Sequence, residues 1–241
     1  MEERSDIRTA VRERYGAIAE GKGGCCGSGA CCGTAELGYS AEEKAAIPEG
    51  ANLGLGCGNP IGLAGPKSGE TVLDLGSGAG VDAFLAAREV GPEGRVIGVD
   101  MTPAMIDRAR ANASKSGYAN VEFRLGEIEH LPVSDASVDL IVSNCVVNLS
   151  PEKDRVFREA YRVLKPGGRM LVSDLVLEQP LPQETRASIE AYVGCIAGAS
   201  LRADYLGFIR EAGFEEVEVV REGRYGTEPV TSVQVRALKR A

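Results

Sequence analysis

The stretch DLGSGAG, residues 74–80, lies between an apolar run and a pattern typical of a helix at 81–91. Its glycines, Gly76, Gly78 and Gly80, permit a tight turn in which the backbone can approach a ligand closely. An apolar run, a glycine turn and a helix in this order predict the strand–turn–helix unit of an open α/β sheet.

Outward from this turn, strand-like and helix-like patterns alternate along the chain. Apolar runs predict further strands at residues 95–100, 121–126, 138–144 and 169–176. Helical spacing of apolar residues predicts helices at 103–117, 151–164 and 203–212. Two runs with period-2 alternation, 215–220 and 231–238, predict an antiparallel C-terminal hairpin. The predicted fold class is therefore α/β, a doubly wound and mostly parallel sheet finished by this hairpin and preceded by an N-terminal extension.

The first part of the chain lacks this regular alternation. Helical spacing begins near the N-terminus, and Ser40 with Glu43 forms a capping box for a short helix. A long glycine-rich stretch at 50–69 then predicts a loop. We expect residues 1–69 to form a helical, cysteine-rich extension with a substrate loop, and residues 70–241 to form one folding unit.

Composition limits the classes of protein to consider. The 241 residues carry a formal net charge of −8 and no basic run, which argues against a nucleic-acid partner. The N-terminus lacks the apolar core of a signal peptide, and no apolar run reaches the length that spans a bilayer. We therefore expect a cytoplasmic protein, monomeric, with no membrane contact.

A carboxylate follows the glycine turn at the sequence spacing that is typical of a ribose-binding residue. Asp100 ends the next predicted strand, about twenty residues further on, where a carboxylate can bond ribose hydroxyls. The glycine spacing is GxGxG, whereas dinucleotide sites that hold a pyrophosphate normally show GxGxxG. An ordinary tight turn without a ligand is the alternative for the glycines alone, and Asp100 counts against it.

Four of the seven cysteines form the segment CCGSGACC, residues 25–32. In a reducing compartment cysteines indicate metal, redox or catalytic chemistry rather than a disulfide framework. A zinc site is one possibility, but adjacent cysteines rarely ligate one metal together and the chain has a single histidine. The glycines and serine between the pairs favour a mobile thiol arm.

Three further cysteines, Cys57, Cys145 and Cys195, are dispersed along the chain. Taken singly, each could be a small buried hydrophobic residue, and Cys195 fits that interpretation best because its surroundings are apolar and helical in pattern. Cys145 follows the fourth strand at the carboxyl edge of the sheet, where open α/β folds bind ligands. Cys57 stands on the glycine-rich loop, which could fold over the same edge.

The segments VLDLGSGAG, VIGVDMT and VLKPGGRML together resemble the class I S-adenosylmethionine-dependent methyltransferases, which have a Rossmann-like fold. The resemblance covers residues 70–177 and implies S-adenosylmethionine as the cofactor. It places the turn near the amino-acid part of the cofactor, Asp100 on the ribose and Met101 on the adenine. The cofactor-binding residues that it implies are Asp74, Gly76, Ser77, Gly78, Gly80, Asp100, Met101, Met105, Glu127, Ile128 and Asn144.

The segments GLGCGNP, SNCVVNLS and CIAGA resemble arsenite methyltransferases of the short prokaryotic type. That resemblance implies methylation of trivalent arsenic, supplied as a thiol conjugate, with thioredoxin or glutathione as the reductant. It implies Cys145 and Cys195 as principal arsenic ligands, Cys57 as a third, and one cysteine of the N-terminal cluster as a fourth functional thiol. We favour Cys31 and Cys32 because they are nearer to the folded part, and we expect no structural metal.

The implied chemistry is consistent with the residues present. Soft thiolates select soft ions such as trivalent arsenic. Arsenic held by three sulfurs keeps a lone pair that can attack a sulfonium methyl in an S_N2 step. No general base is needed, and His130 is expected to be an ordinary solvated loop residue.

Two other functions stay open from the sequence. A methyltransferase for a small carbon or oxygen acceptor, such as a quinone precursor, would share the core without needing Cys57, Cys145 and Cys195. A thiol-based sensor of metal or arsenic would use the same scaffold without catalysis, but the chain shows no helix-turn-helix signature or basic face.

Overall fold

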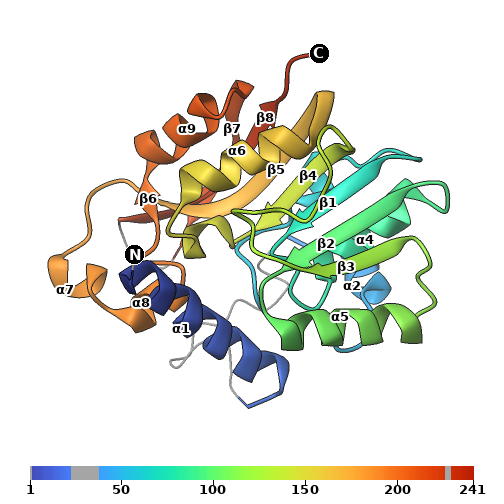
Figure 1. Cartoon of the computed structure of the whole chain (residues 1–241), viewed down its shortest axis with the longest axis horizontal. Helices are drawn as coiled ribbons and strands as arrows, with labels where there is room; N and C mark the ends of the chain where they lie inside the picture. The colour runs from blue at the N-terminus through green and yellow to red at the C-terminus, as the bar shows by residue number, and fades with distance from the viewer. Residues whose placement is uncertain (1, 23–37, 226–228) are drawn as a thin grey trace.

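The computed structural model describes residues 2–22, 38–225 and 229–241, and its centre is one eight-stranded mixed sheet (Figure 1). The strand order is β3-β2-β1-β4-β5-β8-β7, and β6 pairs with β5 beside this path. The strands are β1 (Thr71–Leu75), β2 (Arg95–Asp100), β3 (Val121–Leu125), β4 (Val138–Asn144), β5 (Leu164–Leu177), β6 (Ser200–Leu201), β7 (Glu215–Arg224) and β8 (Val230–Leu238).

Strand directions confirm the predicted fold class. The β1–β2, β2–β3, β1–β4, β4–β5 and β5–β6 pairs are parallel, whereas β5–β8 and β7–β8 are antiparallel. The chain order reverses between β1 and β4, so their carboxyl ends border the crevice in which such sheets bind ligands. The C-terminal hairpin inserts β8 beside β5 and leaves β7 at the edge.

Alternating side chains of the strands feed two separate hydrophobic layers. On one face Leu73 and Ile141 pack with Phe157 of α6 and Tyr205 of α9. On the other face Val72, Leu140 and Val142 pack in a second core cluster with α4 and α5. Both faces are thus covered by helices, which is why the central strands are apolar almost throughout.

The helices follow the alternation that the sequence indicates. Figure 1 shows α4 and α5 against one side of the sheet and α6 and α9 against the other. The helices are α1 (Glu2–Ala19), α2 (Ala41–Ala46), α3 (Ile61–Ala64), α4 (Val81–Val90), α5 (Pro103–Lys115), α6 (Lys153–Val163), α7 (Gln183–Arg186), α8 (Ile189–Val193) and α9 (Arg202–Glu211), with a 3₁₀ turn at Val147–Leu149. The predicted capping box is present, because Ser40 and Glu43 bond each other's backbone N–H groups at the start of α2.

Helix α1 lies against the sheet's ligand-binding edge rather than apart from the domain. It packs against α5 and α8 (Figure 1), and Val11 and Ile18 are buried. Val11 belongs to a core cluster with Cys57 and Cys195, and Ile18 to a second with Met105. Residues from the start of the chain therefore form one wall of the site.

Several details differ from the sequence-based expectations, and α7, α8 and β6 were not predicted. Strand β5 begins at Leu164, before the Pro-Gly-Gly segment. Gly167 N–H donates to Lys239 O and Lys239 N–H donates to Gly168 O, at 2.9 Å each, so strand pairing continues through this segment. The predicted loop contains one helical turn, α3. Cys195 lies beyond the end of α8 with φ of 64°, in a turn rather than within a helix.

Candidate functional site

A cavity opens at the carboxyl ends of β1 and β4, and the glycine turn forms its floor. Gly76 N–H and Ser77 N–H donate to Val99 O at 2.8 and 3.0 Å, which binds the turn to β2. Gly76 has φ of 68° and Gly78 has φ of 51°, a region that L side chains rarely adopt. A Cβ on Gly76 would lie 2.4 Å from Val146, whereas one on Gly78 would meet nothing nearer than 4.0 Å. The backbone at Gly78 is thus open to a ligand.

Asp100 is fixed at the end of β2 by backbone donors. Gly78 N–H donates to Asp100 Oδ2 at 3.0 Å, and Thr102 N–H donates to Oδ1 at 2.8 Å. Burial raises the pKa of Asp100, and these two N–H groups partly offset that effect. Each oxygen keeps a further lone pair, so the carboxylate is oriented yet able to accept from a ligand hydroxyl.

Asp74 carries an unpartnered oxygen at the cavity. Its side chain is buried, and Oδ2 has no hydrogen-bond partner among the described residues. Burial raises its pKa well above the ordinary value, with further contributions from the carboxylates of Asp82 and Asp100. Ser77 Oγ is also buried without a partner in the described part of the chain. Buried polar atoms without partners are costly, so these two indicate that a polar ligand group belongs here.

The structure separates the sequence-predicted cofactor residues into two groups. Those that line the cavity are Asp74, Gly76, Ser77, Gly78, Asp100, Met101, Ile128 and Asn144. Gly80, Met105 and Glu127 are outside the cavity lining found among the described residues. Gly80 starts α4, where a Cβ would lie 2.6 Å from the Phe84 ring. Met105 is 1% exposed and packs beneath the turn, and Glu127 pairs with arginines of α1.

The three dispersed cysteines meet beside this cavity. Cys57 Sγ, Cys145 Sγ and a carboxylate oxygen of Asp174 all lie within 4.8 Å of one another. Cys195 Sγ approaches Cys145 O at 3.3 Å, and Cys145 and Cys195 both line the cavity. All three thiols are free. Three segments that are well separated in the sequence thus bring their cysteines to one place next to the glycine turn.

Both cavity cysteines have unusual backbone conformations. Cys145 has φ of 59° and Cys195 has φ of 64°, values that are uncommon for residues other than glycine. The Cys145 conformation is held by its N–H, which donates to Ser173 O at 2.8 Å. Non-glycine residues in this region cluster at functional sites, where surrounding structure maintains the strain.

The thiols are neutral at ordinary pH. Burial raises the pKa of Cys57 to about 11, against a contact with Cys145 that lowers it. For Cys145 the contact with Cys195 lowers the pKa, but the contact with Cys57 and burial raise it to a net value well above the ordinary one. For Cys195 the contact with Cys145 and burial both raise the pKa. The site therefore holds S–H groups until a ligand displaces their protons.

Asn144 connects the loop that carries Cys57 to the start of α4. Its Oδ1 accepts from Cys57 N–H at 3.0 Å, and its Nδ2 donates to Gly58 O at 2.8 Å and to Asp82 Oδ2 at 3.0 Å. Tyr39 OH donates to the other oxygen of Asp82 at 2.7 Å. Asn144 thus fixes the backbone of Cys57 relative to the start of α4, while it also lines the cavity.

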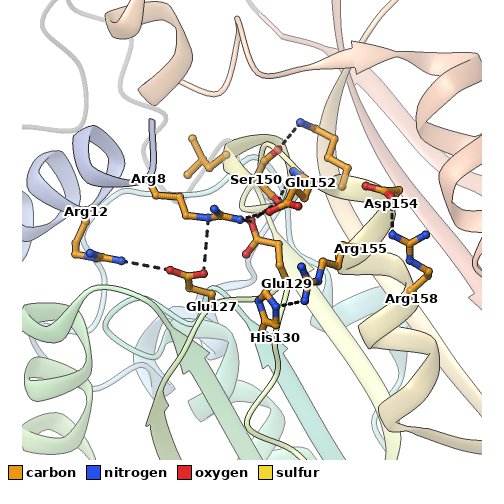
Figure 2. Close-up of polar contacts among 12 residues, drawn as sticks. Arg8, Arg12, Glu127, Glu129, His130, Ser150, Glu152, Asp154, Arg155 and Arg158 are labelled. Carbon is orange, nitrogen blue, oxygen red and sulfur yellow. Dashed lines mark hydrogen bonds and ion pairs between the residues drawn. The ribbon is translucent and has the colours of Figure 1, made fainter. Parts of the chain in front are cut away.

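Arg8 on helix α1 lines the cavity and contacts a group of glutamates (Figure 2). Arg8 Nη2 lies 3.2 Å from Glu129 Oε1 and 2.6 Å from Glu152 Oε2, and its Nε lies 3.7 Å from Glu127. Glu129 is 3% exposed and also accepts from Ser150 Oγ at 2.5 Å. Because Arg8 also lines the cavity, this ion-pair cluster attaches the helix to the site.

Sequence reasoning did not identify several site residues. Asp174, Asp82, Tyr39, Arg8 and Glu129 contribute through contacts between segments distant in sequence. Only Asp174, polar within an apolar strand, carried a local signal. The favoured Cys31 and Cys32, with Cys25 and Cys26, lie outside the described residues.

Comparisons with known proteins agree with this geometry. A family model described as "Methyltransferase domain" matches residues 66–213. An arsenite methyltransferase of Halobacterium salinarum is 54% identical over 229 residues, which is 89% of this chain and 59% of the relative. One of Aquipseudomonas alcaligenes is 44% identical over 184 residues, 73% of this chain and 52% of the relative. The chain thus spans between half and three fifths of these curated relatives.

A solved structure gives the same result. The arsenic(III) S-adenosylmethionine methyltransferase of Chlamydomonas reinhardtii superimposes with a TM-score of 0.70 and 38% identity, over 84% of this chain and 71% of that one. Among the helices described here, none is both long and apolar enough to cross a membrane. The sheet order, the cavity with its thiols and these matches lead to one conclusion: the chain belongs to the class I methyltransferases and, within them, to the arsenite methyltransferase family.

Proposed function

We propose that this protein transfers the methyl group of S-adenosylmethionine to trivalent arsenic held by cysteine thiols. The observation that carries the proposal is the meeting of Cys57, Cys145 and Cys195 at the edge of the cavity that the glycine turn lines. A methyltransferase of a carbon or oxygen acceptor has no use for three convergent sulfurs. A thiophilic substrate explains them directly.

The cavity fits the proposed cofactor. Bound there, S-adenosylmethionine supplies an electrophilic methyl group on a sulfonium centre. Asp74 Oδ2, which lacks a partner in the described structure, would accept from the ammonium group, and Asp100 would accept from the ribose hydroxyls. Met101 and Ile128 line the cavity and offer apolar surface for the adenine.

The neutral thiols suit capture of arsenite as arsenous acid. In the balanced reaction As(OH)₃ and three RSH groups give As(SR)₃ and three water molecules, so each S–H proton leaves with a hydroxyl. No separate base is required, which agrees with the raised thiol pKa values. The product keeps a lone pair on arsenic, and that pair is the nucleophile.

The chain's main contribution to catalysis would be orientation. Cys145 and Asn144 are adjacent in sequence and line the cavity, so β4 places a thiol and a cavity-lining amide at a fixed separation. Tyr15 and Val11 of α1 line the same cavity and exclude water from it. The fixed thiols would hold arsenic facing the methyl group, so little conformational entropy would be lost on reaching the transition state.

Further features of the proposal go with this chemistry. Residues 1–69 would serve as an extension that supplies Cys57 and the α1 wall. Cys31 or Cys32 would hand arsenic to the three thiols or join a transient disulfide, with thioredoxin or glutathione as reductant. We propose a cytoplasmic monomer.

The test is formation of S-adenosylhomocysteine with and without arsenite in the presence of a thiol. We expect product only when arsenite is present. Cys145→Ser should lower turnover by at least ~100-fold, as loss of an oriented group does, while cofactor binding by calorimetry stays within twofold. Cys195→Ser should behave in the same way.

Two outcomes would contradict the proposal. Full activity of Cys145→Ser would remove the arsenic assignment. Turnover of a quinol without arsenite, unaffected by either substitution, would indicate the alternative methyltransferase of a carbon or oxygen acceptor.

A further inference from the structure

A buried carboxylate lies directly beside the thiols. Asp174 stands on β5 with 0% exposure, and one of its oxygens is within 4.8 Å of both Cys57 Sγ and Cys145 Sγ. The preceding residue, Ser173, accepts at its carbonyl from Cys145 N–H at 2.8 Å and from Cys57 Sγ at 3.7 Å. The same stretch of β5 therefore positions both sulfurs and the carboxylate.

Burial raises the pKa of Asp174 to about 7, while the hydrogen-bond donors around it and the nearby charge of Lys153 favour the carboxylate and partly oppose that shift. Leu175 N–H donates to Oδ1 at 2.9 Å, while Asn148 N–H and Tyr205 OH donate to Oδ2 at 3.1 and 3.2 Å. Donors of this kind stabilise a carboxylate. Oδ1 has one donor and so retains a lone pair for another interaction. Nothing in the proposed binding of cofactor or arsenic has used this group.

Methyl transfer would place a positive charge on arsenic, close to Asp174. Arsenic bound to three thiolates is neutral. When its lone pair forms the As–C bond, the electron pair of the breaking C–S bond stays on the donor sulfur, which becomes a neutral thioether. The positive charge therefore moves from sulfur to arsenic, into a buried site where an adjacent carboxylate has its largest effect.

We propose that Asp174 is a charge-stabilising residue that completes the Cys57–Cys145 pair as a site for positive charge. It lowers the energy of the cation that arsenic becomes during methyl transfer. The same group of two sulfurs and one oxygen should bind a soft divalent cation such as Cd²⁺. This inference rests on the proposed function.

The test compares Asp174→Asn with wild type in three measurements. Arsenite forms a neutral complex, so its Kd should change less than threefold. The kcat for methylation should fall by ~100-fold, in the range seen when a charge-stabilising group is removed. Affinity for Cd²⁺, followed by the ultraviolet sulfur-to-cadmium charge-transfer band, should fall by more than tenfold.

Two further variants control for structure. Tyr205→Phe removes one donor but leaves the Asp174 carboxyl group in place, and should retain kcat and Cd²⁺ affinity within about threefold, the size of one lost hydrogen bond. Asp174→Glu keeps the charge on a longer side chain and should bind Cd²⁺ more tightly than Asp174→Asn. If neither substitution at position 174 folds, the residue is structural and the inference is wrong.

The remaining outcomes are separable. If wild type methylates arsenite and Asp174→Asn equals it in kcat and Cd²⁺ affinity, the inference fails and the proposed function stands. If Asp174→Asn loses arsenite binding as well, Asp174 assembles the site rather than stabilising charge, and the inference is again wrong. If wild type forms no product with arsenite, the proposed function fails and takes the inference with it.

Discussion

Cys57 shows how burial changes a single thiol. Its pKa is raised to about 11, so at pH 8 the thiolate fraction is about 100-fold below that of a thiol with a pKa near 9. We therefore expect iodoacetamide to modify Cys57 at pH 8 at least ~100-fold more slowly than a free cysteine in a peptide. The rate should still rise with pH beyond 10, because deprotonation is then incomplete. Mass spectrometry of the peptide that contains Cys57 measures this.

A rate at pH 8 equal to that of the reference peptide would show that Cys57 is exposed and ionised, contrary to the structure. Arsenite provides the matched control. Once arsenic occupies the three sulfurs, alkylation of Cys57 should stop at every pH.

At this scale the sequence identified the thiols but not their electrostatic environment. Cys57, Cys145 and Cys195 were recognisable from the sequence segments around them, whereas Asp174 was not singled out. Its proposed role depends on β5 passing beside both sulfurs, which is a property of the register between β4 and β5. Single-sequence patterns do not contain that register.

Helix α1 is the element that connects the N-terminal extension to the cavity. Arg8 bridges to Glu129 and Glu152, and the Glu129 side chain is only 4% exposed. Removing one partner of a buried ion pair leaves the other charge uncompensated. Arg8→Ala should therefore loosen α1 and raise the cofactor Kd by ~10-fold, equivalent to about 1.4 kcal/mol. Isothermal calorimetry measures the change.

Arg12 on the same helix is the control for this prediction. Its side chain is 43% exposed and lies 3.5 Å from Glu127, so screening by water makes the pair weak. Arg12→Ala should change the cofactor Kd by less than twofold. Equal effects of the two substitutions would mean that α1 responds to total charge rather than to the Arg8 contacts.

The elements themselves were largely predictable, and the differences have local causes. Most helices and strands of the 70–241 region followed from helical spacing, apolar runs and period-2 alternation, whereas α7, α8 and β6 were not predicted. The start of β5 was misplaced because Pro-Gly-Gly usually breaks a strand, whereas here Lys239, just after β8, supplies backbone partners. The packing of α1 against α5 and α8 could not be predicted, because the apolar pattern of a helix does not show which elements it packs against.

Taken as a whole, the molecule should report ligand binding as stability. A ligand present at ~100 times its Kd adds about 2.7 kcal/mol to the free energy of unfolding. For a protein of this size that corresponds to a rise in Tm of about 5–10 °C. We expect arsenite and cofactor each to raise Tm, measured by differential scanning calorimetry in a reducing buffer.

Cys145→Ser separates the two contributions. It should abolish the shift caused by arsenite and keep the shift caused by the cofactor. An unchanged arsenite shift in this variant would place the arsenic elsewhere on the chain.

The overall fold was predictable because three levels of pattern agree: the glycine turn, the alternation of elements and the C-terminal hairpin. From the sequence alone, the convergence of the three thiols was only a hypothesis. It depends on the glycine-rich loop crossing the sheet edge, and a loop's path is set by tertiary contacts such as those of Asn144.

The strand β8 has a consequence for how the protein matures. Ser232 Oγ donates to Cys57 O at 3.0 Å, and Gln234 Nε2 donates to Asn59 O at 3.1 Å, so the loop bearing the first of the three thiols is anchored by a strand made about 175 residues later. A nascent chain emerging from the ribosome has these sulfurs but not their final anchor. Synthesis itself thereby delays assembly of the three-thiol site until β8 has been made.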